Sequence, residues 1–578
     1  MNVSGRPGRP ALVAAAWLAG AAAAGAGLGP VSAPVPNVYG PGILFALSGV
    51  DVPARAANAF VASTIEGPGL HFHLPKDPRI RVLVPGGSEA LRWRIVSNDL
   101  LVADVRGDPQ PLVIALAAPN VVVGRVPQGG RVASEGGGLE CVVMRRAEGQ
   151  RTRFAFAYDS AGGRAAADLA TAALPTDLES LIENRLDVLG RLPRAPANTD
   201  PALALAMAKA VTVMKVNLCA PEGPIRTPWT VLDRWPHGDV GLWGSAFHSL
   251  GLMHLDMALA RDALLAVYGF QVPGGFIPHR MGPRGTSGLA HPPVLAWAAW
   301  QVYGRQRPPD RAFLERSFEA AEKHVEWFLE NRRVEGAALY AWKTGEESGA
   351  ENSPRFDQGA DFAAVDLSAY LANECRTLQA MAQALRYREI ALKWDRKASE
   401  VEESARQHLW DERRGFFFDR RGPRGEWLDL WTYAGLLPLW AGVATNEQAA
   451  RVVQHLLDKD KFWTALPVPT VARGDPTFAK DMWRGPTWAG VNYLVIRGLQ
   501  RYGYTKEAED LRQRTLRALA AWYARTGAFW EFYDPDGRTP PADLDRKGRL
   551  AAGAGWPVIG DYHATAALYV DLLMRPAP

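Results

Sequence analysis

Twelve segments with the apolar spacing of helices follow one another over the last two thirds of this chain of 578 residues. In the segment 365–386, Leu367, Leu371 and Leu378 lie four and seven positions apart, which places them on one face of a helix. Six helical hairpins in series favour a closed toroid, whose inner helices line a funnel and whose loops form its mouth. The predicted helices are 201–217, 245–256, 259–268, 293–304, 311–331, 365–386, 388–410, 431–440, 446–458, 487–502, 506–525 and 559–574.

The chain before these helices is typical of β-structure. From 36 to 173, runs rich in Val, Ile and Leu, such as 79–84 and 112–123, alternate with Gly-Pro and Gly-Gly-Gly breakers. Regular strand spacing with such turns predicts a β-sandwich without a catalytic group. A capping signature at the start of 174–200 predicts a linker helix. The predicted fold is multidomain, β then α: a β-sandwich over 36–173 followed by an (α/α)6 toroid over 201–578.

The N-terminal segment 1–33 has the features of a signal peptide. Arg6 and Arg9 precede an uncharged run over 11–29, and small residues follow at Val31-Ser-Ala33. The run is rich in Ala and Gly and only weakly apolar, which favours a removed signal over a permanent anchor. We therefore expect export, to the periplasm or outside the cell, with no stable membrane span after signal removal.

Composition excludes several classes of function. The net charge of +4 comes from 65 basic and 61 acidic residues, so no excess charge points to nucleic acid. Three scattered cysteines (Cys141, Cys219 and Cys375) give neither a disulfide framework nor a metal site. No histidine pair has the i, i+4 spacing of a helical zinc site, so we predict no metal.

The stretch from Glu347 to Asp357 is a dense polar cluster. It holds three carboxylates (Glu347, Glu351 and Asp357), one guanidinium (Arg355) and a carboxamide, and its glycine and proline argue against a regular helix. Burying these groups without partners would cost several kcal/mol, roughly. A polar loop of this kind faces a ligand or forms a solvated network of salt bridges, and both interpretations fit the sequence.

A second carboxylate lies among aromatic residues far downstream. In the run Phe-Trp-Glu-Phe-Tyr-Asp over 529–534, Glu531 sits between Trp530 and Phe532, where desolvation would tune its proton affinity. Asp534 begins a tight turn and is expected to be structural. Two carboxylates on separate loops, set among aromatic rings, are what hydrolysis of a glycosidic bond requires.

Three further motifs combine aromatic and polar residues at the expected mouth of the funnel. The run 234–248 contains Trp243 and His248, and 274–279 ends on His279. In 482–488 an arginine is bracketed by two tryptophans. Flat indoles of this kind support the apolar faces of sugar rings. Packing in the core, caps of local turns and a structural cation–π pair are the alternative explanations. The residues of the last motif are Trp483, Arg484 and Trp488.

Taken in order, these motifs resemble the helical-toroid glycoside hydrolases of families 63 and 37. The resemblance is nearest to the mannosylglycerate-hydrolase-like and amylo-α-1,6-glucosidase-like branch and covers roughly 195–578. The family's Trp-Asp-Ser-x-Phe-His motif is similar to Trp243–His248. Its Glu-Ser-Gly-x-Asp-Asn-Ser-Pro-Arg motif is similar to Glu347–Arg355, and its Trp-Arg-Gly-Pro-x-Trp motif to Trp483–Trp488. Its Glu-x-Tyr-Asp/Asn-Pro run falls on Glu531.

The resemblance implies an inverting glycoside hydrolase that cleaves an α-linked glucoside, mannoside or related sugar without a cofactor. Glu351 would protonate the leaving oxygen, and Glu531 would deprotonate the attacking water. The carbohydrate substrate would be bound by Trp243, His248, His279, Arg355, Asp357, Trp483, Arg484 and Trp488.

The chain departs from the family pattern at two positions. The family's general-acid aspartate is Glu351 here, and the aspartate expected to bind a sugar hydroxyl is Gly244. Two alternatives therefore stand beside hydrolysis. One is a carbohydrate-binding protein on the same toroid that lost catalysis. The other is a different toroid chemistry, sugar epimerisation or polysaccharide elimination, for which the proton carriers would be His248, His279 or His291.

Overall fold

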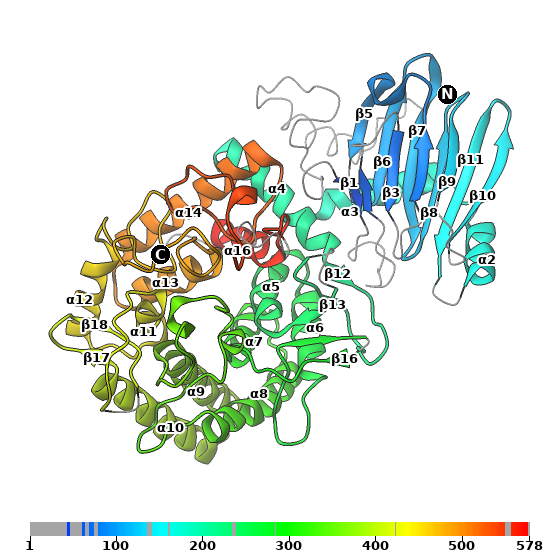
Figure 1. The fold of residues 1–578 in the computed structure, drawn as a ribbon. Helices are drawn as coiled ribbons and strands as arrows, with labels where there is room; N and C mark the ends of the chain where they lie inside the picture. Colours follow the sequence, from blue (N-terminus) through cyan, green and yellow to red (C-terminus); the bar gives the residue numbers. More distant parts are fainter. Residues whose placement is uncertain are drawn as a thin grey trace, which may run out of the picture. The chain divides into compact units, whose positions relative to one another are not determined.

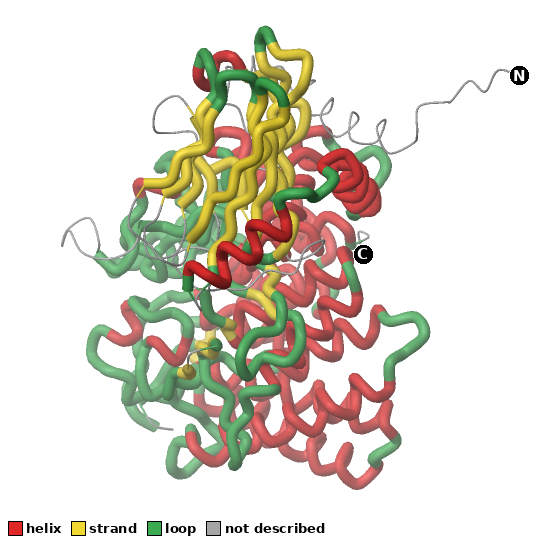
Figure 2. Tube along the Cα trace, turned by 90° about the vertical axis from the view of Figure 1, so that its right-hand side faces the viewer, coloured by secondary structure: helices red, strands yellow, loops and turns green. Residues whose placement is uncertain are grey.

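The computed structural model describes residues 43–46, 61–63, 69–73, 79–96, 98–135, 141–159, 162–233, 238–283, 285–421, 424–548 and 557–575. The predicted signal peptide, 1–33, lies outside these residues. The described chain forms two compact units, one built mainly of strands and one mainly of helices (Figure 2). The first unit holds the described residues up to Glu222, with Asp233–Gly238 and Ala520–Phe529, and the second holds the rest.

Two antiparallel sheets form most of the first unit. A five-stranded sheet has the order β1-β2-β3-β4-β9, and a six-stranded sheet has the order β10-β11-β8-β7-β6-β5. The strands of the first are Ile43–Ala46, Val61–Ser63, Gly69–His73, Arg79–Leu83 and Arg131–Glu135. Those of the second are Cys141–Glu148, Arg151–Tyr158, Val121–Val126, Asp108–Ala118, Leu100–Val105 and Leu91–Val96.

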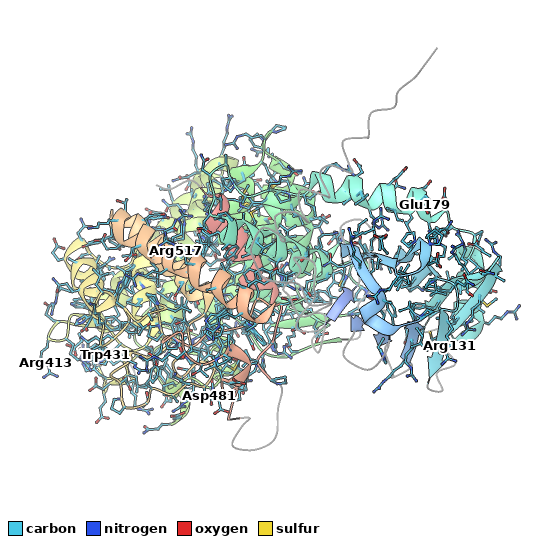
Figure 3. The ribbon with its side chains drawn as sticks, turned by 90° about the horizontal axis from the view of Figure 1, so that it is seen from above. Arg131, Glu179, Arg413, Trp431, Asp481 and Arg517 are labelled. Carbon is cyan, nitrogen blue, oxygen red and sulfur yellow. The ribbon has the colours of Figure 1, made fainter. Side chains whose placement is uncertain are left out.

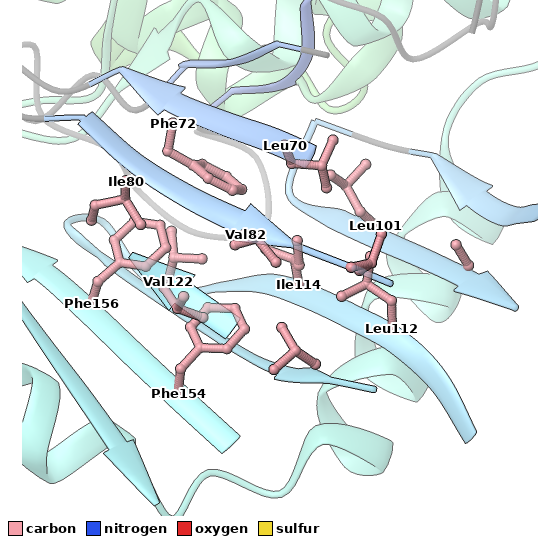
Figure 4. Packing of buried hydrophobic residues seen from close by; sticks show 14 of the residues in the cluster. Leu70, Phe72, Ile80, Val82, Leu101, Leu112, Ile114, Val122, Phe154 and Phe156 are labelled. Atoms are coloured by element: carbon pink, nitrogen blue, oxygen red, sulfur yellow. The ribbon is translucent and has the colours of Figure 1, made fainter. Parts of the chain in front are cut away.

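One hydrophobic core takes residues from both sheets (Figure 4). Phe154 and Phe156 are two positions apart on β11 and therefore point to the same face. The ring of Phe156 meets that of Phe72 on β3 edge-to-face, with 5.2 Å between centroids. A second cluster on the other face of the six-stranded sheet packs against α2 (Gly163–Ala173) and α3 (Leu178–Arg191). The runs rich in Val, Ile and Leu therefore form two sheets that share one hydrophobic core.

The helix α4, Pro201–Val216, belongs to the first unit. Asp200 caps its first turn by accepting a hydrogen bond from the amide of Ala202 at 2.8 Å. Near its other end, Lys215 Nζ lies 3.8 Å from Asp99 Oδ1, and both side chains are fully buried. A buried ammonium requires a buried carboxylate, so this pair fixes α4 on the strands. The first compact unit consequently runs to Glu222, past the boundary that composition suggested at 200.

Helices dominate the second unit. Each of the twelve predicted segments overlaps a helix of the structure, and the first of these helices is α4. Their ends differ from the predicted ones by a few residues, since the first and last turns depend on caps that periodicity does not reveal. Besides α4, they are α5 (Leu242–Leu255), α6 (Met257–Tyr268), α7 (Leu295–Arg305), α8 (Arg311–Asn331), α9 (Val365–Leu385), α10 (Arg388–His408), α11 (Leu437–Ala441), α12 (Asn446–Leu456), α13 (Ala489–Arg501), α14 (Thr505–Thr526) and α16 (His563–Met574).

Six of these helices contact one another in a closed cycle. The order is α5, α7, α9, α11, α13 and α16, and α16 packs back on α5 (Figure 1). We call these the inner helices. Most residues of α5 and α16 are buried, as expected for helices that are covered on all sides, whereas α8 and α10 have one buried face and one charged face. No helix in the described part of the chain is both long and apolar enough to cross a membrane.

Candidate active site

A small cavity of about 30 Å³ lies at the N-terminal ends of the inner helices α5, α13 and α16. Its walls combine aromatic rings with one carboxylate, and we call it the aromatic pocket. The lining includes Trp243 on α5, Trp483 and Trp488 before α13, Tyr562 before α16, and Glu531. These residues come from three of the motifs that the sequence singled out.

The tryptophans of the aromatic pocket form a continuous stack. Trp483 lies parallel to Trp488 with 3.9 Å between ring centroids and meets Trp243 at 6.0 Å. The indole nitrogen of Trp488 donates to the carbonyl of Met482 at 3.1 Å. The indole nitrogens of Trp243 and Trp483 are buried and have no hydrogen-bond partner among the described residues. The stack therefore places three indole rings side by side at the pocket.

The acid loop, which we define as Glu346 to Asp357, reaches this pocket through a turn that requires glycine. A 3₁₀ turn over Glu346–Ser348 ends at Gly349, whose φ of 72° is in the left-handed region. A Cβ at this position would lie 3.0 Å from the ring of Trp243. The turn thus brings Glu351, two residues later, close to the tryptophan stack.

Glu351 is partly buried and sparsely paired. Its Oε1 lies 3.7 Å from the ammonium of Lys547, a side chain that is 44% exposed. Its Oε2 is buried and has no hydrogen-bond partner among the described residues. One carboxyl oxygen is therefore free to exchange a proton with a ligand.

Glu531 is almost fully buried and holds a bidentate ion pair. Arg546 Nε donates to Glu531 Oε2 at 2.8 Å, and its Nη2 donates to Oε1 at 3.1 Å. Burial lowers the pKa of Arg546, but the charge of Glu531, its hydrogen bonds and the charges of Glu351 and Tyr562 together outweigh burial and raise that pKa. Glu351 adds to the same effect, so both carboxylates lie within electrostatic reach of one guanidinium.

Arg546 and Lys547, the basic residues that pair with Glu531 and Glu351, were not singled out by the sequence analysis. Both carboxylate oxygens of Asp481 (labelled in Figure 3) hold this segment, because Oδ1 accepts from the amide of Lys547 at 2.7 Å and Oδ2 from that of Gly548 at 3.0 Å. The pair lies fifteen and more residues beyond Glu531 in an ordinary charged turn. No local pattern distinguishes it from a solvated loop.

Arg484 and Asp357 form an ion pair beside the tryptophan stack. The two terminal nitrogens of Arg484 donate to the two carboxylate oxygens of Asp357, each at 2.7 Å. Asn352 Oδ1 accepts from the amide of Trp483 at 3.0 Å. The acid loop and the Trp483 motif are therefore joined directly, and Asp357, half exposed, keeps a carboxylate face toward solvent.

His248, one of the predicted binding residues, packs against a second histidine, His563. His248 is fully buried, its Nδ1 lies 2.8 Å from Thr230 Oγ1, and its ring stacks on His563 at 3.7 Å. Burial, with a smaller contribution from His563, holds the pKa of His248 well below its usual value, and burial lowers the pKa of His563 to about 3. Both rings are therefore neutral over the working pH range of most enzymes.

His291, which was not among the predicted binding residues, lies between His279 and Trp243. The Nδ1 of His279 lies 2.6 Å from Ser287 Oγ, and burial, aided by Arg280, lowers the pKa of His279 to about 4. The ring centroid of His291 is 5.5 Å from that of His279 and 5.8 Å from that of Trp243. His291 is thus the nearer of the two to the pocket.

Residues 240–540 match the family described as the mannosylglycerate hydrolase MGH1-like glycoside hydrolase domain. This match spans more than half of the chain. The chain belongs to this family. The family that the ordered motifs predicted is thereby confirmed, and the protein is a glycoside hydrolase.

Individual relatives agree with this assignment. Mannosylglycerate hydrolase MGH1 of Selaginella moellendorffii is 26% identical over 373 residues, covering 51% of this chain and 75% of that protein. The mannosylglycerate hydrolase of Thermus thermophilus is 26% identical over 395 residues, covering 54% of this chain and 91% of that protein. The crystal structure of a family GH63 mannosylglycerate hydrolase from Thermus thermophilus in complex with glucose aligns at a TM-score of 0.53 and 25% identity, over 63% of this chain and 99% of that one.

Gly244 replaces an aspartate of the family motif, and the space for a side chain there is filled. A Cβ at Gly244 would lie 2.4 Å from Leu232 Cδ2 and 3.2 Å from His248 Cε1. A larger residue would fit only if the leucine moved. The side chain of Leu232 therefore occupies the space beside Gly244, which itself lines the aromatic pocket. Arg234 to His237, which begin the same motif, lie outside the described residues.

The structure corrects the sugar contact suggested for Arg355. Its side chain is fully buried, and its guanidinium makes four hydrogen bonds, two to Asp366 at 2.5 and 2.9 Å and two to Asp419 at 2.5 and 3.0 Å. Asp419 also accepts from the amide of Val365, the first residue of α9. Arg355 therefore fixes the acid loop to the inner helix α9 and does not face a ligand.

Arg355→Ala is expected to destabilise the enzyme by about 3–5 kcal/mol, because it leaves Asp366 and Asp419 buried without a cation. Urea unfolding followed by tryptophan fluorescence measures the loss. Arg484→Ala is the matched control: its partner Asp357 is half exposed, so the loss there should be about 0–1 kcal/mol. Equal losses in the two variants would contradict the structural role of Arg355.

Proposed function

We propose that this glycoside hydrolase inverts the anomeric centre of an α-linked glucoside, mannoside or related sugar and acts after export. The fold that we propose for it is a β-sandwich followed by an (α/α)6 toroid. The shared core of the two sheets supports the first part. The closed cycle of inner helices, with partner helices α6, α8 and α10 packed on them, supports the second.

The observation that supports the proposal is that two carboxylates from separate loops act on one guanidinium beside the aromatic pocket. Glu351 presents an unpaired carboxyl oxygen, and Glu531 lines the pocket itself. Both lie within electrostatic reach of Arg546. An inverting glycosidase needs one carboxylic acid and one carboxylate on opposite sides of the scissile bond, with room for water between them.

The two carboxyl groups are suited to different roles. Glu531 is held as a carboxylate, because a bidentate pair with a guanidinium requires the ionised form, and a general base must be ionised. As the base, Glu531 would accept the proton of the attacking water molecule. Glu351, with no such bidentate partner, would donate its proton to the departing glycosidic oxygen.

The aromatic pocket would form one wall of the sugar site, because its volume of about 30 Å³ is too small for a whole sugar ring. Its aromatic rings would supply apolar surface to that site. Gly244 lacks the carboxylate expected from the family motif, so binding would rely more on these rings. Asp357 and Arg484 stay predicted binding residues at the edge of the acid loop.

The leaving group that we propose is a small hydroxy acid or a second sugar. The relatives are named for mannosylglycerate, in which the sugar is joined to a carboxylic acid. Lys547, 44% exposed and 3.7 Å from Glu351 Oε1, would place a cation near the departing group. Such a cation favours an acidic leaving group over a neutral one.

The test combines a substrate panel with proton NMR of the first product. Mannosylglycerate, glucosylglycerate and neutral α-linked disaccharides are each incubated with the full chain. The proposal expects a free sugar that appears first as the β-anomer and then mutarotates. An α-anomer as the first product would refute inversion, and binding without release of sugar would refute hydrolysis of that panel.

Export rests on the N-terminal segment alone. Expression of the full chain in a bacterial host, followed by fractionation, should yield a shortened protein in the periplasm or medium, with its new N-terminus near residue 34. Retention of the intact N-terminus in the cytoplasm would refute the proposal.

A further inference from the structure

A second cavity, of about 760 Å³, lies toward the C-terminal ends of the inner helices. We call it the arginine cavity. It is formed by α7, α9, α13 and α16, with Trp440 of α11. Five guanidinium groups line it, and no carboxylate of the described residues does. The five are Arg305, Arg376, Arg497, Arg501 and Arg575.

The arginine cavity is distinct from the aromatic pocket. On α13 the aromatic pocket takes Ala489, whereas the arginine cavity takes Arg497 and Arg501. The corresponding residues at α16 are Ala564 near its start and Arg575 directly after its last residue. Eight residues of helix separate the first pair, which is roughly 12 Å at 1.5 Å per residue. The two cavities therefore occupy opposite ends of the same inner helices, and none of the groups proposed for catalysis lines the second.

The arginine cavity carries an excess of positive charge. Among the described residues, three carboxylates contact its guanidinium groups: Asp395, Glu402 and Asp571. Neither Arg497 nor Arg501 has a carboxylate within ion-pairing distance in the described part of the chain. Arg497 is held by a hydrogen bond to Gln500 at 2.6 Å. Five cations against three anions leave two positive charges unmatched.

The unmatched charge is unfavourable among these side chains. Burial lowers the pKa of Arg497, as do the guanidinium groups of Arg575 and Arg501, and the opposing effects of Tyr493 and Asp571 do not cancel this decrease. Asp571 is fully buried and already shared, because it accepts from His254 and Tyr493 as well as from Arg575. An anion bound among these arginines would relieve the repulsion without competing for an existing pair.

Helix ends account for only part of the cluster. Carbonyl groups at a helix C-terminus attract cations, which suits Arg501 and Arg305 at the last residues of α13 and α7. Arg376 lies in the middle of α9, and Arg497 lies a full turn before the end of α13. Their side chains turn to the same cavity, so the helix dipole does not explain their convergence.

A polar donor and aromatic rings complete the arginine cavity. Asn373 is only 3% exposed, lines the cavity, and its amide nitrogen has no hydrogen-bond partner among the described residues. A buried unpaired donor is rare in proteins and points to a missing acceptor. Trp297, Trp300 and Trp440 form the apolar part of the lining. The volume falls within the range of about 300–1,000 Å³ that small-molecule sites occupy.

We propose that the arginine cavity binds a phosphate monoester of a small sugar or polyol. Guanidinium forks match the oxygens of a phosphate group in pairs, which makes arginine the preferred residue for this ligand. Arg497 and Arg501 supply the charge for the dianion, Asn373 donates to one of its oxygens, and the tryptophans cover the apolar face of the organic part. Free phosphate shares the anionic chemistry, and the experiment separates the two sources.

The experiment is calorimetric titration of the full chain, with thermal unfolding as a second readout. The probes are inorganic phosphate and glucose 6-phosphate, each against sodium chloride at equal ionic strength. We expect saturable binding and a higher unfolding temperature with glucose 6-phosphate. Binding at least about tenfold tighter than that of phosphate identifies the ester as the ligand, and equal affinities identify the phosphate group alone.

Two variants locate the binding. Arg497→Gln/Arg501→Gln removes the two unmatched charges and should weaken binding of glucose 6-phosphate about tenfold or more, because each charged hydrogen bond contributes strongly. Asn373→Ala changes no charge and should weaken it less. Arg388→Gln/Arg517→Gln is the matched control, since both arginines are exposed on α10 and α14 and the charge change is the same. The control should bind as the natural chain does.

The outcomes are decisive in both directions. No saturable binding of either probe by the natural chain overturns the proposal, whatever the variants do. Equal binding by the natural chain and by Arg497→Gln/Arg501→Gln also overturns it, because the ligand then sits elsewhere. Should that double variant fail to fold, unchanged affinity in Asn373→Ala overturns it and a lower affinity supports it.

Discussion

Glu351→Gln is expected to lower kcat/KM for substrates with a sugar or hydroxy-acid leaving group by about 10²- to 10⁴-fold. The amide is nearly the same size as the acid but has no proton to give to the departing oxygen. Glycosyl fluorides need little such help, because fluoride leaves without protonation. Their hydrolysis should fall by less than about tenfold in the same variant. Steady-state kinetics on both substrate types gives the comparison.

Glu346→Gln is the matched control for this change. Glu346 lies on the same acid loop and is exposed, so the same substitution alters the charge of the loop but not the proposed proton donor. Its activity on both substrate types should stay near that of the natural enzyme. An equal and severe loss on both substrates in Glu351→Gln would show that Glu351 is not the acid.

Local sequence singled out four of the residues that line the aromatic pocket: Trp243, Trp483, Trp488 and Glu531. Trp243, Trp483 and Glu531 belong to short motifs whose order along the chain matched one family, and periodicity placed each motif next to a helix. Gly349 was an expected break, and its positive φ is what turns Glu351 toward the tryptophans. These features depend on neighbours in sequence and on the known family pattern, so the sequence alone reveals them.

The groups that surround those residues could not be predicted, because they come from distant segments. Arg355 was expected to contact sugar, but it pairs with buried carboxylates instead. One of them, Asp419, lies 64 residues away in the sequence. Arg546 and Leu232 carry no motif, yet one pairs with Glu531 and the other fills the space beside Gly244. Such contacts follow from how the inner helices and their loops pack, and no spacing rule encodes them.

The residues of the arginine cavity could not be predicted from the sequence either. Arg376, Arg497 and Arg575 each look like ordinary charged residues of a helix, and their spacing in sequence is irregular. Only the closed cycle of inner helices brings them together. A site made of one residue from each of several helices is therefore invisible to motif analysis, whereas a site built on loops with Gly, Pro and Trp is not.

Glu531→Gln is expected to abolish hydrolysis of both substrate types, with a loss of about 10²- to 10⁴-fold in kcat. A glutamine cannot accept the proton of the attacking water, and a good leaving group such as fluoride does not replace that step. The variant also turns the ion pair with Arg546 into a neutral contact, which leaves a buried guanidinium without its partner and costs stability. Activity must therefore be scaled by the folded fraction, measured by near-ultraviolet circular dichroism.

Glu402→Gln separates the loss of a base from the loss of an ion pair. Glu402 is buried and accepts bidentate bonds from Arg376, at 2.6 and 2.8 Å, but it lies on the outer helix α10. It should lower stability by a smaller amount, because Arg376 is partly exposed and keeps Asp395 as a partner, and it should leave kcat per folded molecule unchanged. A fluoride substrate that Glu531→Gln still hydrolyses at the natural rate would remove Glu531 from the role of base. If Glu351→Gln keeps most of its activity on glycosyl fluorides and Glu531→Gln loses it, Glu351 is the acid and Glu531 is the base. This assignment does not require the natural sugar to be known.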